Sequence, residues 1–101
     1  MTIQNVYTLD MYEWDETKRQ KNLEKHYLDF RDARLMFDGR PVVHIQAIRN
    51  NEARYASTAL IETMFYTVVW TWRSGVRRII SFRRARDGEK KAYREIHGKG
   101  T

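Results

Sequence analysis

The spacing of hydrophobic and polar positions changes near Gly39 and Pro41. Before this break, apolar residues are sparse or recur at helical intervals, whereas after it they alternate with polar residues or run in short β-branched and aromatic stretches. A helical half followed by a strand-rich half is typical of the α+β class. The pattern therefore predicts two N-terminal helices and a C-terminal helix packed on an antiparallel β-sheet meander.

A short strand and a polar helix are predicted at the start of this pattern. Residues 11–14 alternate briefly, and Asp15 is placed to cap a helix that runs to about residue 26. Leu23 is the one strongly apolar residue of this helix, so the helix has little to bury. We expect a surface helix that presents polar side chains.

A second, shorter helix is predicted to pack inward. Asp29 is placed to cap it, and its apolar residues fall at the i, i+3, i+7 spacing of a core-facing stripe: Phe30, Ala33 and Phe37.

Four strands are predicted in the second half of the chain, at residues 42–48, 54–61, 64–73 and 76–84. The joints between them are short, so consecutive strands should pair antiparallel. Regular alternation along the last strand predicts one face with Arg77, Ile79, Ser81 and Arg83 and an opposite face with Val76, Arg78, Ile80, Phe82 and Arg84.

A helix is also predicted at the C-terminal end. Asp87 is placed to cap it, and its narrow apolar strip consists of Ala92, Tyr93 and Ile96.

Length and composition fit one folded domain, since the chain has 101 residues, of which 13% are aromatic and 32% charged. No apolar run has the length of a membrane span, and the N-terminus lacks the basic and apolar pattern of a signal peptide. The absence of cysteine excludes disulfides and thiolate zinc sites. The cytoplasm is therefore the expected compartment.

Positive charge is concentrated in the last quarter of the chain. The formal net charge is +6, and residues 76–101 alone carry nine basic and three acidic residues, while residues 1–75 balance. A local positive field attracts polyanions, of which nucleic acid is the common one. The alternative is an ordinary solvated basic face.

One candidate site lies on the first helix, where Lys18, Asn22 and His26 follow one another at intervals of four residues and Lys25 precedes the histidine. A histidine beside cationic side chains can exchange a proton while lysine stabilises the charge on a phosphate. The structural alternative is that Lys25 and His26 interact with the negative end of the helix dipole.

The second candidate site is a set of arginines at the end of the last strand. Alternation sends Arg83 and Arg84 to opposite faces, and Arg86 follows them. One of the pair would contact a phosphate, while the other would pair with a carboxylate such as Glu13 or anchor the C-terminal helix. Arg54 lies in a mostly apolar strand and would need a partner if buried. Tyr93 either stacks on a base or packs in the core.

Metal and cofactor sites are not expected. The three histidines lack metal-ligand spacing, and the chain carries no Walker loop, dinucleotide-binding glycine motif or nucleophile elbow.

Two segments, residues 12–37 (YEWDETKRQKNLEKHYLDFRDARLMF) and 78–93 (RIISFRRARDGEKKAY), together resemble the BrnT toxin family. The shared pattern is an E-W-D-E-x-K opening, an N-x-x-K-H centre, an aromatic-led second helix and an R-I-I-S-x-R-R-A strand followed by a glutamate and a tyrosine. On this resemblance the domain spans residues 11–97, between an N-terminal extension at 1–10 and a tail at 98–101.

The resemblance implies a RelE-like fold and a ribonuclease toxin of a type II toxin–antitoxin system. Such a toxin cuts RNA without a metal ion by attack of the 2′-hydroxyl and so stops growth. It would form a hetero-oligomer with a BrnA-like antitoxin of the ribbon-helix-helix type, which would contact operator DNA. The implied catalytic residues are Lys25, His26, Arg54, Arg83 and Arg84, and the implied substrate-binding residues are Lys18, Asn22, Arg86 and Tyr93.

The chain departs from the family pattern at two positions. Tyr27 stands where a glycine usually follows the K-H pair, which disfavours a left-handed end of the helix. Phe82 replaces an alanine and is expected to enlarge the core.

Composition also fits proteins of another class. A non-catalytic RNA- or DNA-binding module would use the same arginines for phosphate contacts, and a structural copy would only sequester an antitoxin.

Overall fold

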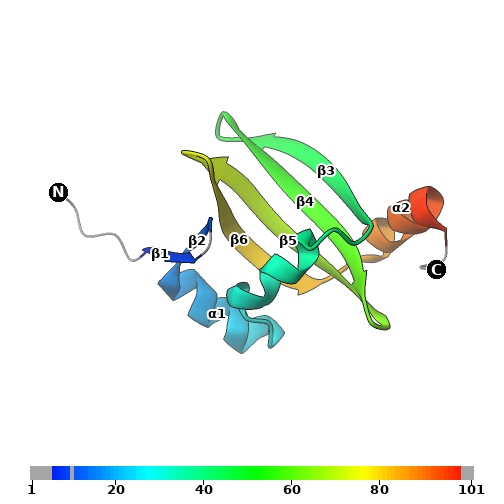
Figure 1. Ribbon diagram of the computed structural model, residues 1–101, viewed down its shortest axis with the longest axis horizontal. Coiled ribbons are helices and arrows are strands. Elements are labelled where there is room, and N and C mark those ends of the chain that lie inside the picture. Colours follow the sequence, from blue (N-terminus) through cyan, green and yellow to red (C-terminus); the bar gives the residue numbers. More distant parts are fainter. Residues whose placement is uncertain (1–5, 10, 99–101) are drawn as a thin grey trace.

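The computed structural model describes residues 6–9 and 11–98 (Figure 1). Residues 1–5 and 10 of the expected extension and residues 99–101 of the expected tail lie outside the described residues. In the described part of the chain, one six-stranded sheet has the order β1-β2-β6-β5-β4-β3. Its strands are β1 (Val6–Leu9), β2 (Tyr12–Asp15), β3 (Val42–Arg49), β4 (Glu52–Ile61), β5 (Met64–Arg73) and β6 (Val76–Arg84).

The α+β class and the four-strand meander are confirmed, because β3, β4, β5 and β6 pair antiparallel in sequence order. The prediction of a wholly antiparallel sheet is wrong, since β2 runs parallel to β6. A tight turn imposes antiparallel pairing only on strands that are neighbours in sequence, and most of the chain separates these two. No strand was predicted at β1, which pairs antiparallel with β2 at the edge of the sheet.

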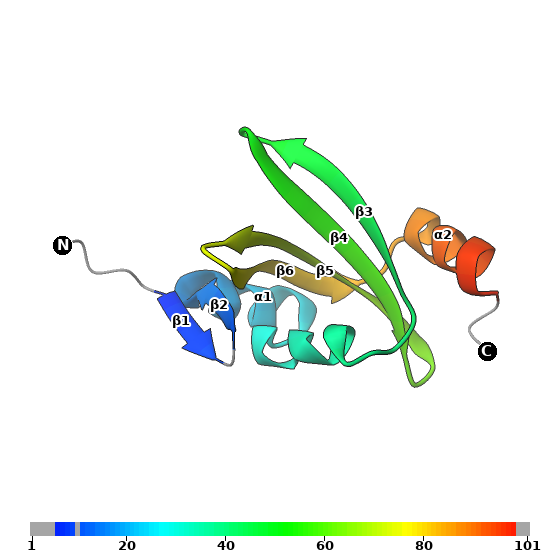
Figure 2. The same cartoon turned by 45° about the horizontal axis from the view of Figure 1, so that its top comes forward.

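Three helices flank this sheet in the described residues: α1 (Glu16–His26), the 3-10 helix η1 (Phe30–Phe37) and α2 (Asp87–His97). Figure 1 shows α2 at the opposite end of the molecule from β1 and β2, and Figure 2 shows α1 and η1 together, away from α2. None of these helices is long and apolar enough to cross a membrane.

The second predicted helix forms with a tighter winding than expected. Its three buried residues, Phe30, Ala33 and Met36, are spaced three residues apart, which is the period of a 3-10 helix. Phe37, predicted for the buried stripe on α-helical spacing, is only partly buried against the core.

The predicted caps of the first two helices are confirmed. Asp15 accepts a hydrogen bond from the backbone N–H of Lys18 at 3.1 Å, and Asp29 accepts one from the backbone N–H of Arg31 at 2.9 Å. Each short acidic side chain satisfies an N–H group that the first turn leaves without a helical partner.

Two details of α2 differ from the prediction. The capping residue is Arg86 rather than Asp87, and its backbone N–H donates to the side chain of Glu89 at 2.8 Å. Of the predicted apolar strip, Tyr93 is buried whereas Ile96 is 64% exposed. The helix therefore packs through one aromatic ring and its N-terminal turn.

The two faces of the sheet have different coverings. The core face, defined by Ala59, Val68, Trp70 and Phe82, packs against η1. The outer face, defined by Ala56, Thr67, Val69 and Ser81, carries α2 at one end, where Tyr93 meets Phe65 edge-on at 5.1 Å between ring centroids.

Strand β6 breaks the regular alternation predicted for it. Ile79 and Ser81 lie opposite consecutive residues of β5, so Ile80 is one extra residue, a β-bulge. The extra residue lets Ile79 and Phe82 both reach the core, where they are 1% and 2% exposed. The expectation that Phe82 enlarges the core is confirmed, but the predicted division of β6 into two alternating faces is wrong.

Candidate functional site

A cavity of about 360 Å³ lies between α1 and β6 on the outer face, and we call it the α1–β6 pocket. Its cationic lining residues are Lys18, Lys21, Lys25, Arg83 and Arg86. The remaining lining residues are Asn22, His26, Ile80 and Ser81. Five permanent positive charges around one cavity favour an anionic ligand.

The pocket joins the two candidate sites of the sequence. It contains six of the nine predicted site residues, and it adds Lys21. Lys21 was missed, although it lies three residues after Lys18 and four before Lys25, which is the spacing of one helix face. The polar face of α1 is therefore more basic than the sequence analysis recognised.

Asn22 attaches α1 to the edge of β6. Its amide nitrogen donates to the carbonyls of Phe82 at 2.7 Å and Leu28 at 2.9 Å, and its amide oxygen accepts from the N–H of Phe82 at 3.1 Å. The side chain thus pairs with the backbone of Phe82 as a neighbouring strand would. Asn22 lines the pocket, but these bonds use both of its amide N–H donors and its carbonyl oxygen.

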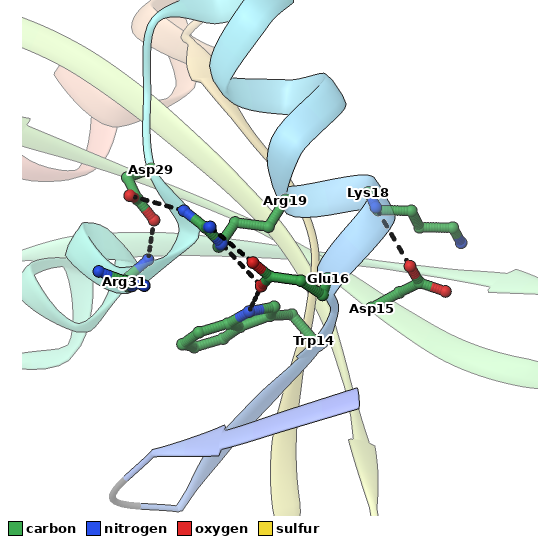
Figure 3. A network of polar contacts seen from close by, with 7 residues as sticks. All are labelled: Trp14, Asp15, Glu16, Lys18, Arg19, Asp29 and Arg31. Carbon is green, nitrogen blue, oxygen red and sulfur yellow. Dashed lines mark hydrogen bonds and ion pairs between the residues drawn. The ribbon is translucent and has the colours of Figure 1, made fainter. Parts of the chain in front are cut away.

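The beginning of α1 is held by an ion-pair network (Figure 3). Arg19 contacts Glu16 at 2.6 Å and Asp29 at 3.0 Å, and the indole N–H of Trp14 donates to Glu16 at 3.0 Å. Hydrogen bonding from Arg19 holds the pKa of Glu16 at about 2. Figure 3 shows the side chains of Arg19 and Lys18 on opposite sides of the helix. Arg19 belongs to the ion-pair network, whereas Lys18 lines the pocket.

The end of α1 is left-handed, contrary to the expectation from Tyr27. Tyr27 has φ 57° and ψ 30°, and its N–H donates to the carbonyl of Leu23 at 2.9 Å. A non-glycine residue in this region costs about 1–2 kcal/mol. The hydrogen bond from Asn22 to Leu28 fixes the chain just beyond the turn, and it helps to offset that cost. His26 is consequently the last residue of the helix and lines the pocket.

The environment of His26 favours the neutral imidazole. Partial burial lowers its pKa from the ordinary 6.5, and the charges of Lys25 and Arg83 lower it further. At neutral pH the ring therefore has a free lone pair that can accept a proton.

Arg83 is fixed at the wall of the pocket by Glu89. Its two terminal nitrogens donate to the two carboxylate oxygens at 2.8 and 2.9 Å. Burial alone would raise the pKa of Glu89, but hydrogen bonds from Arg83, the backbone of Arg86 and the hydroxyl of Thr67 hold it at about 2. The sequence predicted that one of Arg83 and Arg84 contacts a phosphate and the other pairs or anchors the C-terminal helix. In the structure Arg83 both lines the pocket and anchors α2.

Three predicted site residues lie outside the pocket. Arg84 is on the core face, 3.1 Å from the sulfur of Met64 and above the ring of Tyr66. Tyr93, a residue of α2, is 3% exposed and packs between this helix and Phe65 of the sheet. Arg54 lines a separate cavity on the outer face.

Among the described residues, no three or more histidine, aspartate or glutamate side chains form a group that could hold a metal ion.

A family model described as the ribonuclease toxin BrnT of type II toxin–antitoxin systems matches residues 14–89. The chain belongs to the BrnT family. The match contains α1, β6 and Glu89, and therefore every residue that lines the α1–β6 pocket. BrnT membership implies an RNA substrate and an antitoxin partner. No curated protein matches the chain.

Proposed function

We propose that this BrnT family member is a metal-independent endoribonuclease with a RelE-like fold and that it cuts RNA in the α1–β6 pocket. The observation that carries the proposal is that His26, with a lowered pKa, shares one cationic cavity with the oriented guanidinium of Arg83. A proton acceptor and a fixed cation are two of the groups that assist cleavage within an RNA strand.

The nucleophile in this reaction belongs to the substrate. The 2′-hydroxyl oxygen attacks the adjacent phosphorus while the bond from phosphorus to the 5′ oxygen breaks. The products are a 2′,3′-cyclic phosphate and a 5′-hydroxyl end. The proton lost by the 2′-hydroxyl goes to a base, and the departing oxygen gains one from an acid.

We assign the proton acceptor to His26 because its pKa is lowered. Arg83 stabilises the charge that develops on the phosphate, and Lys25 adds charge beside His26. Lys18, Lys21 and Arg86 hold the strand in position through its other phosphates. The place of Arg84 on the core face gives no support to a catalytic role for it.

RNA cleavage in the presence of EDTA tests the mechanism. We expect discrete fragments with cyclic phosphate ends, and no cutting where a 2′-deoxy nucleotide occupies the scissile position. Salt-sensitive binding that leaves the RNA intact would support the binding module instead.

A pH profile tests the assignment of His26. Because the folded pKa lies below 6.5, kcat/KM should rise with pH through a midpoint below 6.5 and then level off. In His26→Ala this acidic limb should disappear together with most of the rate. An unchanged profile would remove His26 from the mechanism.

The partner we propose is a BrnA-like antitoxin of the ribbon-helix-helix type. It would cover the cations of the pocket with acidic side chains, assemble with the toxin as a hetero-oligomer and carry it to operator DNA. Expression of the chain in the cytoplasm should stop growth, and co-expression of the antitoxin should restore it. Co-purification without toxicity would instead indicate a copy that only sequesters antitoxin.

A further inference from the structure

The outer face of the sheet contains a second cavity, of about 330 Å³. Apolar side chains from three strands form its floor: Ile45, Ala47, Ala56 and Val69. Arg49, Arg54 and Arg86 also line it. We call it the β3–β4 cavity.

Strand register connects the β3–β4 cavity with the α1–β6 pocket. Ile45 pairs with Ala56, Ala56 with Val69, and Val69 with Ser81, so these four residues form one row across β3, β4, β5 and β6. The first three line the β3–β4 cavity and Ser81 lines the pocket. Arg86 lines both. The two cavities therefore lie next to each other on the outer face, and we call the surface that contains both of them the groove.

The groove is longer than a single phosphate requires. Three strand spacings separate β6 from β3, or about 14 Å at the usual distance between paired strands. Successive nucleotides of a stacked strand rise by only about 3.4 Å. The groove thus has room for nucleotides on one side of the scissile position.

Arg54 lines this groove and is only loosely paired with a carboxylate. Its Nε is buried without a hydrogen-bond partner, and its contact with Glu52 is 3.7 Å long. Arg73 approaches the same carboxylate more closely, at 3.1 Å. A phosphate in the cavity would pair with the guanidinium of Arg54, which Glu52 holds only loosely.

We propose that the β3–β4 cavity is a subsite for single-stranded RNA next to the scissile phosphate. This inference rests on the proposed function. Arg54 and Arg49 contact phosphates, and the apolar floor packs against a base. Arg54, which the sequence analysis grouped with the catalytic residues, is on this assignment a substrate-binding residue away from the reacting atoms.

Binding of uncleavable RNA measures this subsite separately from the chemistry. A 2′-O-methyl trinucleotide and octanucleotide would be titrated by fluorescence anisotropy at several salt concentrations. We expect the wild-type chain to bind the octanucleotide more tightly. Arg54→Ala and Arg49→Ala should each weaken octanucleotide binding about tenfold and weaken trinucleotide binding much less. Each should also reduce the salt dependence of octanucleotide binding.

Arg34→Ala is the matched control, because it removes the same charge from an exposed position of η1, on the core-face side of the sheet. It should change octanucleotide affinity less than twofold. Equal weakening by Arg34→Ala would show that net charge alone matters, and it would overturn the subsite. If Arg54→Ala does not fold, judged by circular dichroism, exposed Arg49→Ala gives the independent measurement.

The outcomes separate this inference from the proposed function. Intact RNA together with octanucleotide binding that depends on Arg54 would overturn the nuclease and keep the subsite. Cleavage that depends on His26, with octanucleotide binding indifferent to Arg54 and Arg49, would overturn the subsite alone. Variants that lose antitoxin binding but keep RNA binding would also overturn it, because the cavity would then be a protein-binding surface.

Discussion

Two arginines of β6 occupy opposite kinds of environment. Arg77 lies on the core face among four aromatic rings, with its guanidinium carbon 3.8 to 5.7 Å from the centroids of Phe37, Trp70, Trp72 and Tyr12. Arg83 lies on the outer face, paired with Glu89 and lining a cationic pocket. The residue type is the same, and the neighbours determine what each guanidinium can bind.

The difference shows why a basic residue is not by itself a phosphate ligand. The rings surround Arg77 with cation–π contacts, and its Nε is buried without a hydrogen-bond partner. The charge of Arg77 therefore interacts with the aromatic rings of the core face. Both terminal nitrogens of Arg83 pair with Glu89, and its side chain lines the α1–β6 pocket, where we propose that it contacts a phosphate.

The largest effect should appear when the same substitution is made at Arg83 and at Arg77. Arg83→Ala should lower the rate of RNA cleavage about 10²- to 10³-fold, because it removes a charge aimed at the transition state. Arg77→Ala should lower the melting temperature and leave folded protein that still cleaves RNA. Single-turnover cleavage and thermal unfolding of both variants would measure this. Equal loss of cleavage in two folded variants would contradict the distinction between the faces.

Asn22 holds α1 against β6, the two elements that form the α1–β6 pocket. Asn22→Ala should lower the free energy of unfolding by about 2–3 kcal/mol, since it leaves the buried backbone groups of Phe82 without partners. Urea denaturation would measure it. Glu24→Ala, an exposed change on the same helix, is the control and should have little effect. A small loss in Asn22→Ala would mean that α1 is held to β6 by other contacts.

The ion pair of Arg83 should make stability sensitive to acid. The folded pKa of Glu89, about 2, lies below its ordinary value of 4.5, so its contribution is complete above pH 4.5 and is lost as pH falls toward 2. That contribution is at most about 3 kcal/mol. In Glu89→Gln this pH-dependent part should disappear, whereas exposed Glu95→Gln should keep it. The free energy of unfolding would be measured as a function of pH for the wild-type chain and both variants. Curves of the same shape for the wild-type chain and Glu89→Gln would show that the pair does not stabilise the fold.

The smallest effect concerns the turn after His26. Tyr27→Gly should raise the free energy of unfolding by about 1 kcal/mol, because glycine adopts the left-handed conformation without steric cost. Tyr27 is 86% exposed, so little packing is lost. Tyr27→Ala keeps the backbone cost and is the control. If both variants had the same stability, strain at this position would be excluded.

Local signals in the sequence predicted most of the fold. The strands of the meander follow from their β-branched and aromatic runs, and Asp15 and Asp29 cap helices because capping depends on neighbouring residues alone. The parallel pairing of β2 with β6 had no such signal, since it joins distant segments through tertiary contacts.

The candidate site was predictable to the extent that it depends on helix spacing. Lys18, Lys25 and His26 were found in this way, and Lys21 would have been found by extending the same spacing. The bulge at Ile80 was hidden, because an alternating pattern does not reveal which strand carries an additional residue. For the same reason, the sequence did not show that Arg77 and Arg83 lie on opposite faces.

The bulge in β6 also has a consequence for the shape of the strand. Ile80 has no opposite residue in β5, so deletion of a single codon there would give a regular ladder with Ile79, Phe82 and Arg83 on their present sides. Such a deletion would straighten the strand beside the pocket. Strand length alone can therefore change the curvature of the outer face beside the pocket, with no compensating substitution in the hydrophobic interior.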